Sequence, residues 1–385
     1  MFTFVCNYWT NYLKEIICFI GDMMKKIILL ILMFIVPINV LGLASSASSA
    51  IVVDCDSDAV FYEKNPDDRR LIASITKIMT AVVAIENANL DDIVTVGEEV
   101  LSMYGSNIYI ELGEHMTLRN LLYGLLLRSG NDSAIVIATY VGKSEESFVQ
   151  MMNDKAQELG MVNTIFNNSH GLDEITQNYS TASDMAKLSC HAMTLSDYRE
   201  ISSTKFWRLQ GETKSYSWEN RNKLLKLYDY STGGKTGYTP KAGRTLVTTA
   251  SKNNLNLSAV TLNDPNEYVS HENMYEYVFK NYEKYLVIDK NNFRVDKTFY
   301  DEDIYVKRSF YYPLTIKEAE DISILAMLYE MKNYKNDDVV GEVEVRLNNN
   351  VLYKNNIYVR LEEEEEGLWN SIVKFFKRLF GGSDD

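Results

Sequence analysis

Histidine and cysteine are scarce in this chain of 385 residues, which has four of each. The histidines are scattered and none stands in the His-Glu-x-x-His spacing of a metal-dependent peptidase; they are His115, His170, His191 and His271. The sequence also lacks a phosphate-binding glycine loop and the Gly-x-Ser-x-Gly turn of an α/β-hydrolase. We therefore expect no metal site and no cofactor, while the residue counts alone leave a Ser-His-Asp triad open.

The four cysteines are too few for a disulfide framework. Cys6 and Cys18 lie before or within an expected targeting segment, so Cys55 and Cys190 would remain after processing. Free cysteines are often buried. We expect these two to be buried free thiols, with a single bridge as the alternative.

Positive charge is also in short supply. The chain has 39 lysines and arginines against 53 acidic residues, for a net charge of −14. No basic stripe appears in the body of the chain, so a nucleic-acid partner is not expected. The length is sufficient for two or three domains with a proper core.

The N-terminal region has the features of a secretory signal. Met24-Lys25-Lys26 is followed by an apolar run over residues 27–43 and by small residues over 44–50. Pro37 interrupts the apolar run, which disfavours an uncleaved membrane span. We expect synthesis to start near Met24, residues 1–50 to form an extension and signal peptide, and the mature chain to begin between residues 43 and 51.

Residue periodicity indicates a domain over residues 51–285 with strands at both ends and helices between them. Strands are expected at 50–54, 60–64, 233–238, 244–251 and 255–262. Helices are expected at 71–88, 118–127, 133–141, 148–159, 181–193 and 269–285. The terminal strands would join in one antiparallel sheet on which the helical block packs, which is an α/β (α+β) arrangement.

The rest of the chain differs in composition. Residues 286–361 contain charged, tyrosine-rich alternating segments that predict a small β-rich domain without a chemical motif. Residues 362–366 are an acidic spacer. Over 368–380, apolar residues recur at steps of three and four with cations between them, which predicts an amphipathic helix lying on a membrane surface. A terminal helix packed on its own domain is the alternative.

Three short motifs occur in order: Ser74-Ile75-Thr76-Lys77, Ser129-Gly130-Asn131 and Lys235-Thr236-Gly237. The Ser-x-x-Lys spacing alone is weak, because residues 202–205 and 371–374 also match it. The other two motifs occur once each. The first serine opens a buried helix, the second sits at a helix break and the second lysine lies on a strand. This placement predicts that the motifs meet in one cleft.

Ser74 and Lys77 have the spacing of a nucleophile and its own base. Residues at i and i+3 share a helix face, so the lysine amine can reach the serine hydroxyl. A lysine accepts a proton only when neutral, and burial together with a second cation such as Lys235 would lower the pKa of Lys77. Backbone N–H groups at the helix N-terminus can supply half of an oxyanion hole.

The other two motifs can contact a substrate. Ser129 can relay a proton to the leaving group, and Asn131 can hold a substrate amide. Gly237 leaves room for a ligand backbone beside the strand, while Lys235 and Thr236 suit a substrate carboxylate. Each motif alone is as readily an ordinary helix, turn or strand end, and only their joint occurrence favours a catalytic serine.

With these motifs, the chain resembles the low-molecular-mass penicillin-binding proteins, specifically D-alanyl-D-alanine carboxypeptidases. The similar segments are residues 73–80, 127–134, 168–172, 179–184 and 234–239 with Ala242-Gly243. The resemblance covers residues 50–361, and the terminal amphipathic helix is also typical of the family. It implies a β-lactamase/transpeptidase-like catalytic domain followed by a small β-rich domain.

The resemblance also implies a reaction. Ser74 would attack the peptide bond between the two terminal D-alanines of a peptidoglycan stem pentapeptide, and water would hydrolyse the acyl-enzyme. Lys77 would be the general base, Ser129 the second catalytic serine and Lys235 the substrate-binding lysine. Backbone N–H groups of Ser74 and Tyr238 would form the oxyanion hole. β-Lactam inhibitors such as penicillins would acylate Ser74 as substrate mimics.

One departure from the family concerns the carboxylate of the substrate. Many relatives carry an arginine shortly before the helix that follows the third-motif hairpin, where this chain has Val269-Ser270-His271-Glu272. Binding of the carboxylate would then rest on Lys235, Thr236 or Arg244.

Three alternatives stay open. A D,D-endopeptidase that cuts wall cross-links has nearly the same motifs. A serine β-lactamase shares the fold and first motif, but the Glu-x-x-Leu-Asn motif of the class A enzymes is absent and the second motif reads Ser-Gly-Asn. An inactive, membrane-anchored wall-binding protein is disfavoured by the intact motifs.

Overall fold

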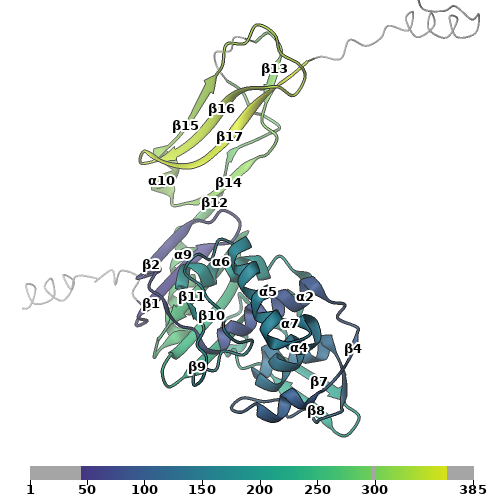
Figure 1. The fold of residues 1–385 in the computed structure, drawn as a ribbon. Helices are drawn as coiled ribbons and strands as arrows, with labels where there is room; N and C mark the ends of the chain where they lie inside the picture. The colour runs from purple at the N-terminus through teal and green to yellow at the C-terminus, as the bar shows by residue number, and fades with distance from the viewer. Residues whose placement is uncertain (1–44, 296–299, 362–385) are drawn as a thin grey trace, which may run out of the picture. The chain divides into compact units, whose positions relative to one another are not determined.

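A computed structural model describes residues 45–295 and 300–361 (Figure 1). The expected signal peptide, the expected amphipathic helix over 368–380 and the Ser-x-x-Lys match at 371–374 lie outside the described residues. None of the helices in the described part of the chain has the length and apolar character needed to cross a membrane.

A five-stranded antiparallel sheet joins strands of residues 49–64 to strands of residues 231–262, in the order β2-β1-β11-β10-β9. The strands are β1 (Ser49–Asp54), β2 (Val60–Lys64), β9 (Ser231–Thr239), β10 (Gly243–Lys252) and β11 (Leu255–Leu262). The expected N-terminal hairpin and its union with the later strands are confirmed. Asn253 and Asn254 have φ values of 52° and 63°, as a tight hairpin turn between β10 and β11 requires. The strand β9 lies at the sheet edge.

Alternate residues of β10 and β11 face opposite sides of this sheet. Val247 and Val260 belong to the core that the helical block shares with α6 (Ala182–Ala192). Thr248 and Thr261 instead lie against α9 (Glu267–Asn281), where their hydroxyls contact the two ring nitrogens of His271 at 2.6 and 3.1 Å. Burial lowers the pKa of His271 to about 3, so this histidine is a neutral part of the core.

The helical block starts with a 3-10 turn, η1 (Ala73–Thr76), which leads into α2 (Lys77–Asn87). It continues with α3 (Leu118–Tyr123), the π-helical turn η3 (Gly124–Arg128), α4 (Asn131–Gly142), α5 (Glu145–Glu158) and α7 (Ser196–Ser203). The expected helices are therefore present with shifted ends. For example, α5 begins earlier than expected because the Ser144 hydroxyl accepts the Ser147 N–H and caps it.

Several short elements have no counterpart in the sequence prediction. Two are short helices, η2 (Glu98–Ser102) and α8 (Leu224–Leu227). The others form three strand pairs: β3 (Arg70–Leu71) with β6 (Tyr179–Ser180), β4 (Ile93–Thr95) with β5 (His115–Thr117), and β7 (Phe206–Gln210) with β8 (Ser215–Glu219). Most of these strands are only two or three residues long. Such segments carry too little periodicity to be recognised, and partners distant in sequence determine them.

The C-terminal β-rich region contains a four-stranded sheet in the order β13-β17-β16-β15 and the pair β12-β14. The strands are β12 (Glu283–Ile288), β13 (Asp303–Tyr305), β14 (Phe310–Leu314), β15 (Ile322–Leu328), β16 (Val339–Leu347) and β17 (Asn350–Arg360), with the short helix α10 (Ile316–Asp321). Its core includes three buried valines of β16 together with Ile357 and Val359 of β17. The helix expected to reach residue 285 ends at Asn281, because Tyr282 turns extended and residue 283 already pairs with β14.

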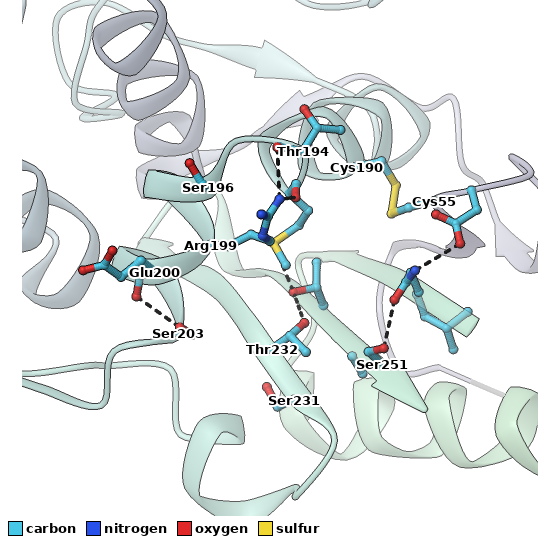
Figure 2. Close-up of a pocket in the computed structure, with 16 residues that line it drawn as sticks. Cys55, Cys190, Thr194, Ser196, Arg199, Glu200, Ser203, Ser231, Thr232 and Ser251 are labelled. Atoms are coloured by element: carbon cyan, nitrogen blue, oxygen red, sulfur yellow. Dashed lines mark hydrogen bonds between the residues drawn. A yellow bond between two sulfur atoms is a disulfide. The ribbon is translucent and has the colours of Figure 1, made fainter. Parts of the chain in front are cut away.

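Cys55 and Cys190 form a disulfide, so the prediction of two free thiols is wrong. Cys55 directly follows β1 and Cys190 lies on α6, and these two elements pack against each other. The pairing depends on this tertiary contact, which the sequence spacing of 135 residues does not reveal. Figure 2 shows the bridge at the edge of a surface cavity.

We predict that Cys190→Ser lowers the free energy of unfolding by about 2–5 kcal/mol, because the bridge closes a long loop of the unfolded chain. Chemical denaturation with and without a reductant measures this. The wild type should lose the same stability on reduction, and the variant should not respond. Equal stability of oxidised and reduced wild type would contradict the prediction.

Candidate active site

The 3-10 turn η1 places Ser74 and Lys77 directly above one another. In such a turn the side chains at i and i+3 eclipse, and Lys77 Nζ donates a hydrogen bond to Ser74 Oγ at 3.1 Å. The serine is half-buried and faces a cleft, whereas the lysine side chain is completely buried. The pair therefore has the geometry of an accessible nucleophile with a base that water does not reach.

The Lys77 amine has two further partners. Nζ donates to Asn131 Oδ1 at 2.7 Å and to the His170 carbonyl oxygen at 2.5 Å. Burial lowers the pKa of Lys77 to about 7, because a charged amine loses its hydration there. A substantial share of the molecules then holds a neutral amine at neutral pH, as a general base requires.

Nearby charges modify this effect of burial. Arg221 lowers the pKa of Lys77 further, and the Asp132 carboxylate opposes it. The sequence analysis expected Lys235 to be the second cation. Arg221 is instead the cation that lowers the pKa of Lys77. Burial and the charges of Lys77 and Arg221 lower the pKa of Lys235 itself well below its ordinary value.

Ala73, the residue before the nucleophile, is in a left-handed conformation with φ of 49°. This conformation is costly for a residue with a Cβ and persists only where the surroundings hold it. Gly171 packs against it so closely that a Cβ there would lie 2.0 Å from the Ala73 carbonyl oxygen. The 168–172 segment thus supports the backbone that presents Ser74.

The second motif follows the π-helical turn η3. Ser129 is itself left-handed, with φ of 64°, and this turn directs the chain into α4, which starts at Asn131. The Asn131 amide is already used at both ends, because Nδ2 donates to the Tyr104 carbonyl at 2.7 Å while Oδ1 accepts from Lys77. Asn131 therefore contacts Lys77 directly. The sequence analysis did not predict this contact.

The third motif lies on β9. Lys235 is buried, and its Nζ donates to the Thr236 carbonyl at 2.6 Å. A Cβ on Gly237 would lie 2.9 Å from the Ser74 backbone nitrogen, so β9 passes directly beside the N-terminus of the nucleophile turn. Tyr238, the next residue, is largely exposed. This close approach can bring backbone N–H groups of β9 and η1 to one carbonyl oxygen.

The motifs meet in a cleft of about 500 Å³ that is lined by Ser74, Ser129, Thr236, Gly237 and Tyr238. Four cationic side chains, Arg128, Arg221, Lys223 and Arg244, also line it, against the single carboxylate of Glu219. The cleft therefore suits an anionic ligand.

Two of the three arginines that line this cleft, Arg221 and Arg244, differ in their contacts. Arg244 lies opposite Tyr238 on β10 and forms an ion pair with Glu267 at 3.3 Å, which occupies part of its charge. Arg221 donates to the Ser106 hydroxyl at 2.7 Å and has no carboxylate within ion-pair distance among the described residues. The sequence analysis missed Arg221 because it lies outside the three motifs.

A larger cavity of about 790 Å³ lies elsewhere, beside the disulfide (Figure 2). It contains none of the motif residues, and Arg199 at its edge donates to the carbonyls of Met193 and Thr194. Size therefore does not identify the catalytic cleft here, whereas the arrangement of nucleophile, base and cations does.

The second Ser-x-x-Lys match, at residues 202–205, does not form such a site. Ser202 is completely buried and its hydroxyl lies near the Arg199 carbonyl, while Lys205 falls beyond the end of α7. Within residues 45–295 and 300–361, no cluster of histidine, cysteine or acidic side chains could hold a metal ion.

The chain is similar in sequence to known proteins of one family. The D-alanyl-D-alanine carboxypeptidase family matches residues 39–266. The D-alanyl-D-alanine carboxypeptidase DacF of Bacillus subtilis is 35% identical over 327 residues, which cover 80% of this chain and 78% of the relative. The D-alanyl-D-alanine carboxypeptidase DacC of Escherichia coli is 29% identical over 367 residues. This match covers 87% of this chain and 90% of the relative.

The fold is also similar to that of solved structures. Penicillin-binding protein 5 from Haemophilus influenzae superimposes with a TM-score of 0.72 and 26% identity, over 82% of this chain and 97% of that one. The three motifs, the fold that brings them together and the extent of these matches lead to one conclusion: the chain belongs to the D-alanyl-D-alanine carboxypeptidase family.

Proposed function

We propose that this enzyme removes the terminal D-alanine from peptidoglycan stem pentapeptides through an acyl-enzyme on Ser74. The hydrogen bond between Lys77 and Ser74, made by an amine that burial holds near neutrality, is the observation that carries the proposal. Family membership supports a serine-type carboxypeptidase that acts on peptidoglycan and binds β-lactams.

In the first step, Ser74 Oγ attacks the carbonyl carbon of the penultimate D-alanine while its proton passes to the neutral amine of Lys77. The carbonyl oxygen becomes an oxyanion, and the backbone N–H groups of Ser74 and Tyr238 would hold it. The close passage of β9 beside η1 supports this role. Donors fixed in this way need no rearrangement during the reaction.

The C–N bond then breaks, and the departing amine of the last D-alanine takes a proton that Ser129 relays from Lys77. Water next attacks the ester on Ser74 and gives a proton to Lys77. Ser74 Oγ leaves the acyl carbon and takes this proton from Lys77, and a stem tetrapeptide is released. The base is thereby restored to its neutral form.

The cationic side of the cleft would bind the terminal carboxylate. Thr236, Lys235 and Arg244 are the candidates from the sequence, and Arg221 adds a cation without an acidic partner. Asn131 would hold the substrate amide with the hydrogen of its Nδ2 that does not bond Tyr104.

The substrate places the enzyme outside the cytoplasm, where its family acts on the wall. We further propose that residues 51–285 form the catalytic domain and 286–361 a separate β-rich domain. Residues 362–385 would then serve as spacer and amphipathic helix and hold the enzyme on the outer face of the membrane. The alternation of apolar and cationic residues in 368–380 supports this anchoring.

Ser74→Ala should abolish covalent labelling by fluorescent penicillin, because the hydroxyl that forms the ester is gone. The measurement is fluorescence that survives denaturation and electrophoresis. Ser202→Ala is the matched control, since Ser202 has the same local motif but is buried away from the cleft, and it should label like the wild type. Label that persists in Ser74→Ala would contradict the assignment of the nucleophile.

The rate of acylation should depend on pH through Lys77. Because the neutral amine is the base and its pKa is about 7, the rate constant should rise with pH up to about 7 and level off above it. Stopped-flow measurement with a chromogenic β-lactam gives this profile. The rising part of this profile is its acid limb. An acid limb with its midpoint at the ordinary lysine pKa would contradict the proposed role of burial.

Arg221→Ala should lower kcat/KM for a D-Ala-D-Ala peptide about ten- to a hundredfold, as expected for loss of a charged hydrogen bond. The value of kcat/KM should fall for the peptide with a free C-terminal carboxylate. It should stay unchanged for the same peptide with a C-terminal amide. Release of D-alanine from the free acid and of D-alaninamide from the amide, both above the acid limb, measures this. Arg199→Ala is the control; an equal loss on both peptides would contradict carboxylate binding.

A further inference from the structure

The segment between Asn167 and Asn178 lies against the nucleophile turn, and Asn178 ties its two ends together. Asn178 is 2% exposed. Its Oδ1 accepts the backbone N–H groups of Asn167 and Asn168 at 2.7 and 3.2 Å. Its Nδ2 donates to the Asn168 carbonyl at 3.0 Å and to Asn168 Oδ1 at 3.1 Å. One amide thus fixes both the backbone and the side chain of Asn168.

Asn168 in turn fixes the carbonyl that contacts the base. Its Oδ1 accepts the backbone N–H groups of His170 at 3.2 Å and Gly171 at 2.6 Å. These bonds define the turn at which the His170 carbonyl points to Lys77 Nζ. The orientation of that carbonyl therefore depends on the Asn168 side chain, which Asn178 holds.

The same Asn178 amide also reaches the nucleophile turn directly. Nδ2 donates to Thr76 Oγ1 at 3.0 Å, and the Thr76 hydroxyl donates to the Ala73 carbonyl at 2.7 Å. That carbonyl belongs to the left-handed residue against which Gly171 packs. Asn178 is thus connected to both partners of the Lys77 contact, the loop carbonyl and the helix that carries the lysine.

We propose that Asn178 is a positioning residue for the general base: its amide locks the Asn168–Gly171 turn onto Thr76 and so holds the His170 carbonyl against the amine of Lys77. Asn178 touches neither substrate nor reacting atoms and acts through these neighbours. The proposal rests on the role of Lys77 in the proposed function.

The amide of an asparagine satisfies both sides of this position. The site requires one acceptor facing two backbone N–H groups and one donor facing the Thr76 hydroxyl and the Asn168 oxygens. An aspartate would place a charged acceptor against those oxygens, and an alanine would leave buried polar groups without partners.

Loss of Asn178 should change how Lys77 titrates. The His170 carbonyl accepts a hydrogen bond that stabilises the ammonium form, so loosening it should lower the pKa of Lys77. The charged or titratable groups that also face Lys77 are Asp132 of α4, Arg221 before α8, Lys235 of β9 and the ring of His170. Burial and the charge of Lys77 keep His170 neutral, lowering its pKa to about 3, so it does not titrate in the same range.

The test compares acylation of the full chain by a chromogenic β-lactam across pH for wild type and Asn178→Ala. Rate constants are normalised to the fraction of protein that a saturating penicillin labels, so that unfolded molecules do not count. We expect the plateau to fall about ten- to a hundredfold, as for a misplaced catalytic group, and the acid limb to move to lower pH. A limb that stays in place or moves to higher pH would overturn the proposal.

Two further variants complete the design. Asn153→Ala removes a half-buried asparagine of α5 that bonds the backbone N–H and carbonyl of Phe166 but touches neither Asn168 nor Thr76. This variant should leave the acid limb unmoved. Thr76→Val removes the hydroxyl between Asn178 and Ala73 and should shift the limb in the same direction as Asn178→Ala. If Asn178→Ala does not fold, an unmoved limb in Thr76→Val overturns the proposal.

The outcomes separate this proposal from the proposed function. An unlabelled wild type would contradict the acyl-enzyme on Ser74. A labelled wild type with an unmoved limb in the Asn178 and Thr76 variants would contradict only the positioning role.

Discussion

Lys77 is completely buried, yet its amine must stay within hydrogen-bond distance of a hydroxyl that faces the cleft. Burial allows a substantial share of the amine to be neutral near pH 7. Three oxygen atoms, from Ser74, Asn131 and His170, hold it in place. A surface lysine would be charged at this pH and could not accept a proton. The segments that surround Lys77 exclude water from this amine and fix its position.

Each oxygen around Lys77 comes from a different part of the chain. The nucleophile turn provides the serine, the start of α4 provides Asn131, and the 168–172 segment provides a backbone carbonyl. The edge strand β9 closes the arrangement by passing beside Ser74 at Gly237. Because the four segments are distant in sequence, only the packed α/β core brings them together, and the disulfide between β1 and α6 adds a covalent link to that core.

The sequence predicted the sheet and the order of the helices from local periodicity, and it predicted the meeting of the three motifs from their joint occurrence and placement. It did not indicate the contact between Lys77 and the His170 carbonyl, since a backbone oxygen has no side-chain signature. It also missed Arg221, which belongs to no motif, and it favoured free thiols for Cys55 and Cys190. These features depend on which segments lie side by side in the folded chain.

The most direct test of this account is the ionisation of Lys77 itself. Protein with ¹³C-labelled lysine can be titrated by NMR, with the Lys77 signal assigned by its absence in Lys77→Arg. The account predicts a midpoint of about 7 for Lys77 in the free enzyme. A midpoint at the ordinary lysine value of about 10.4 would show that burial does not produce a neutral base and would contradict the central claim.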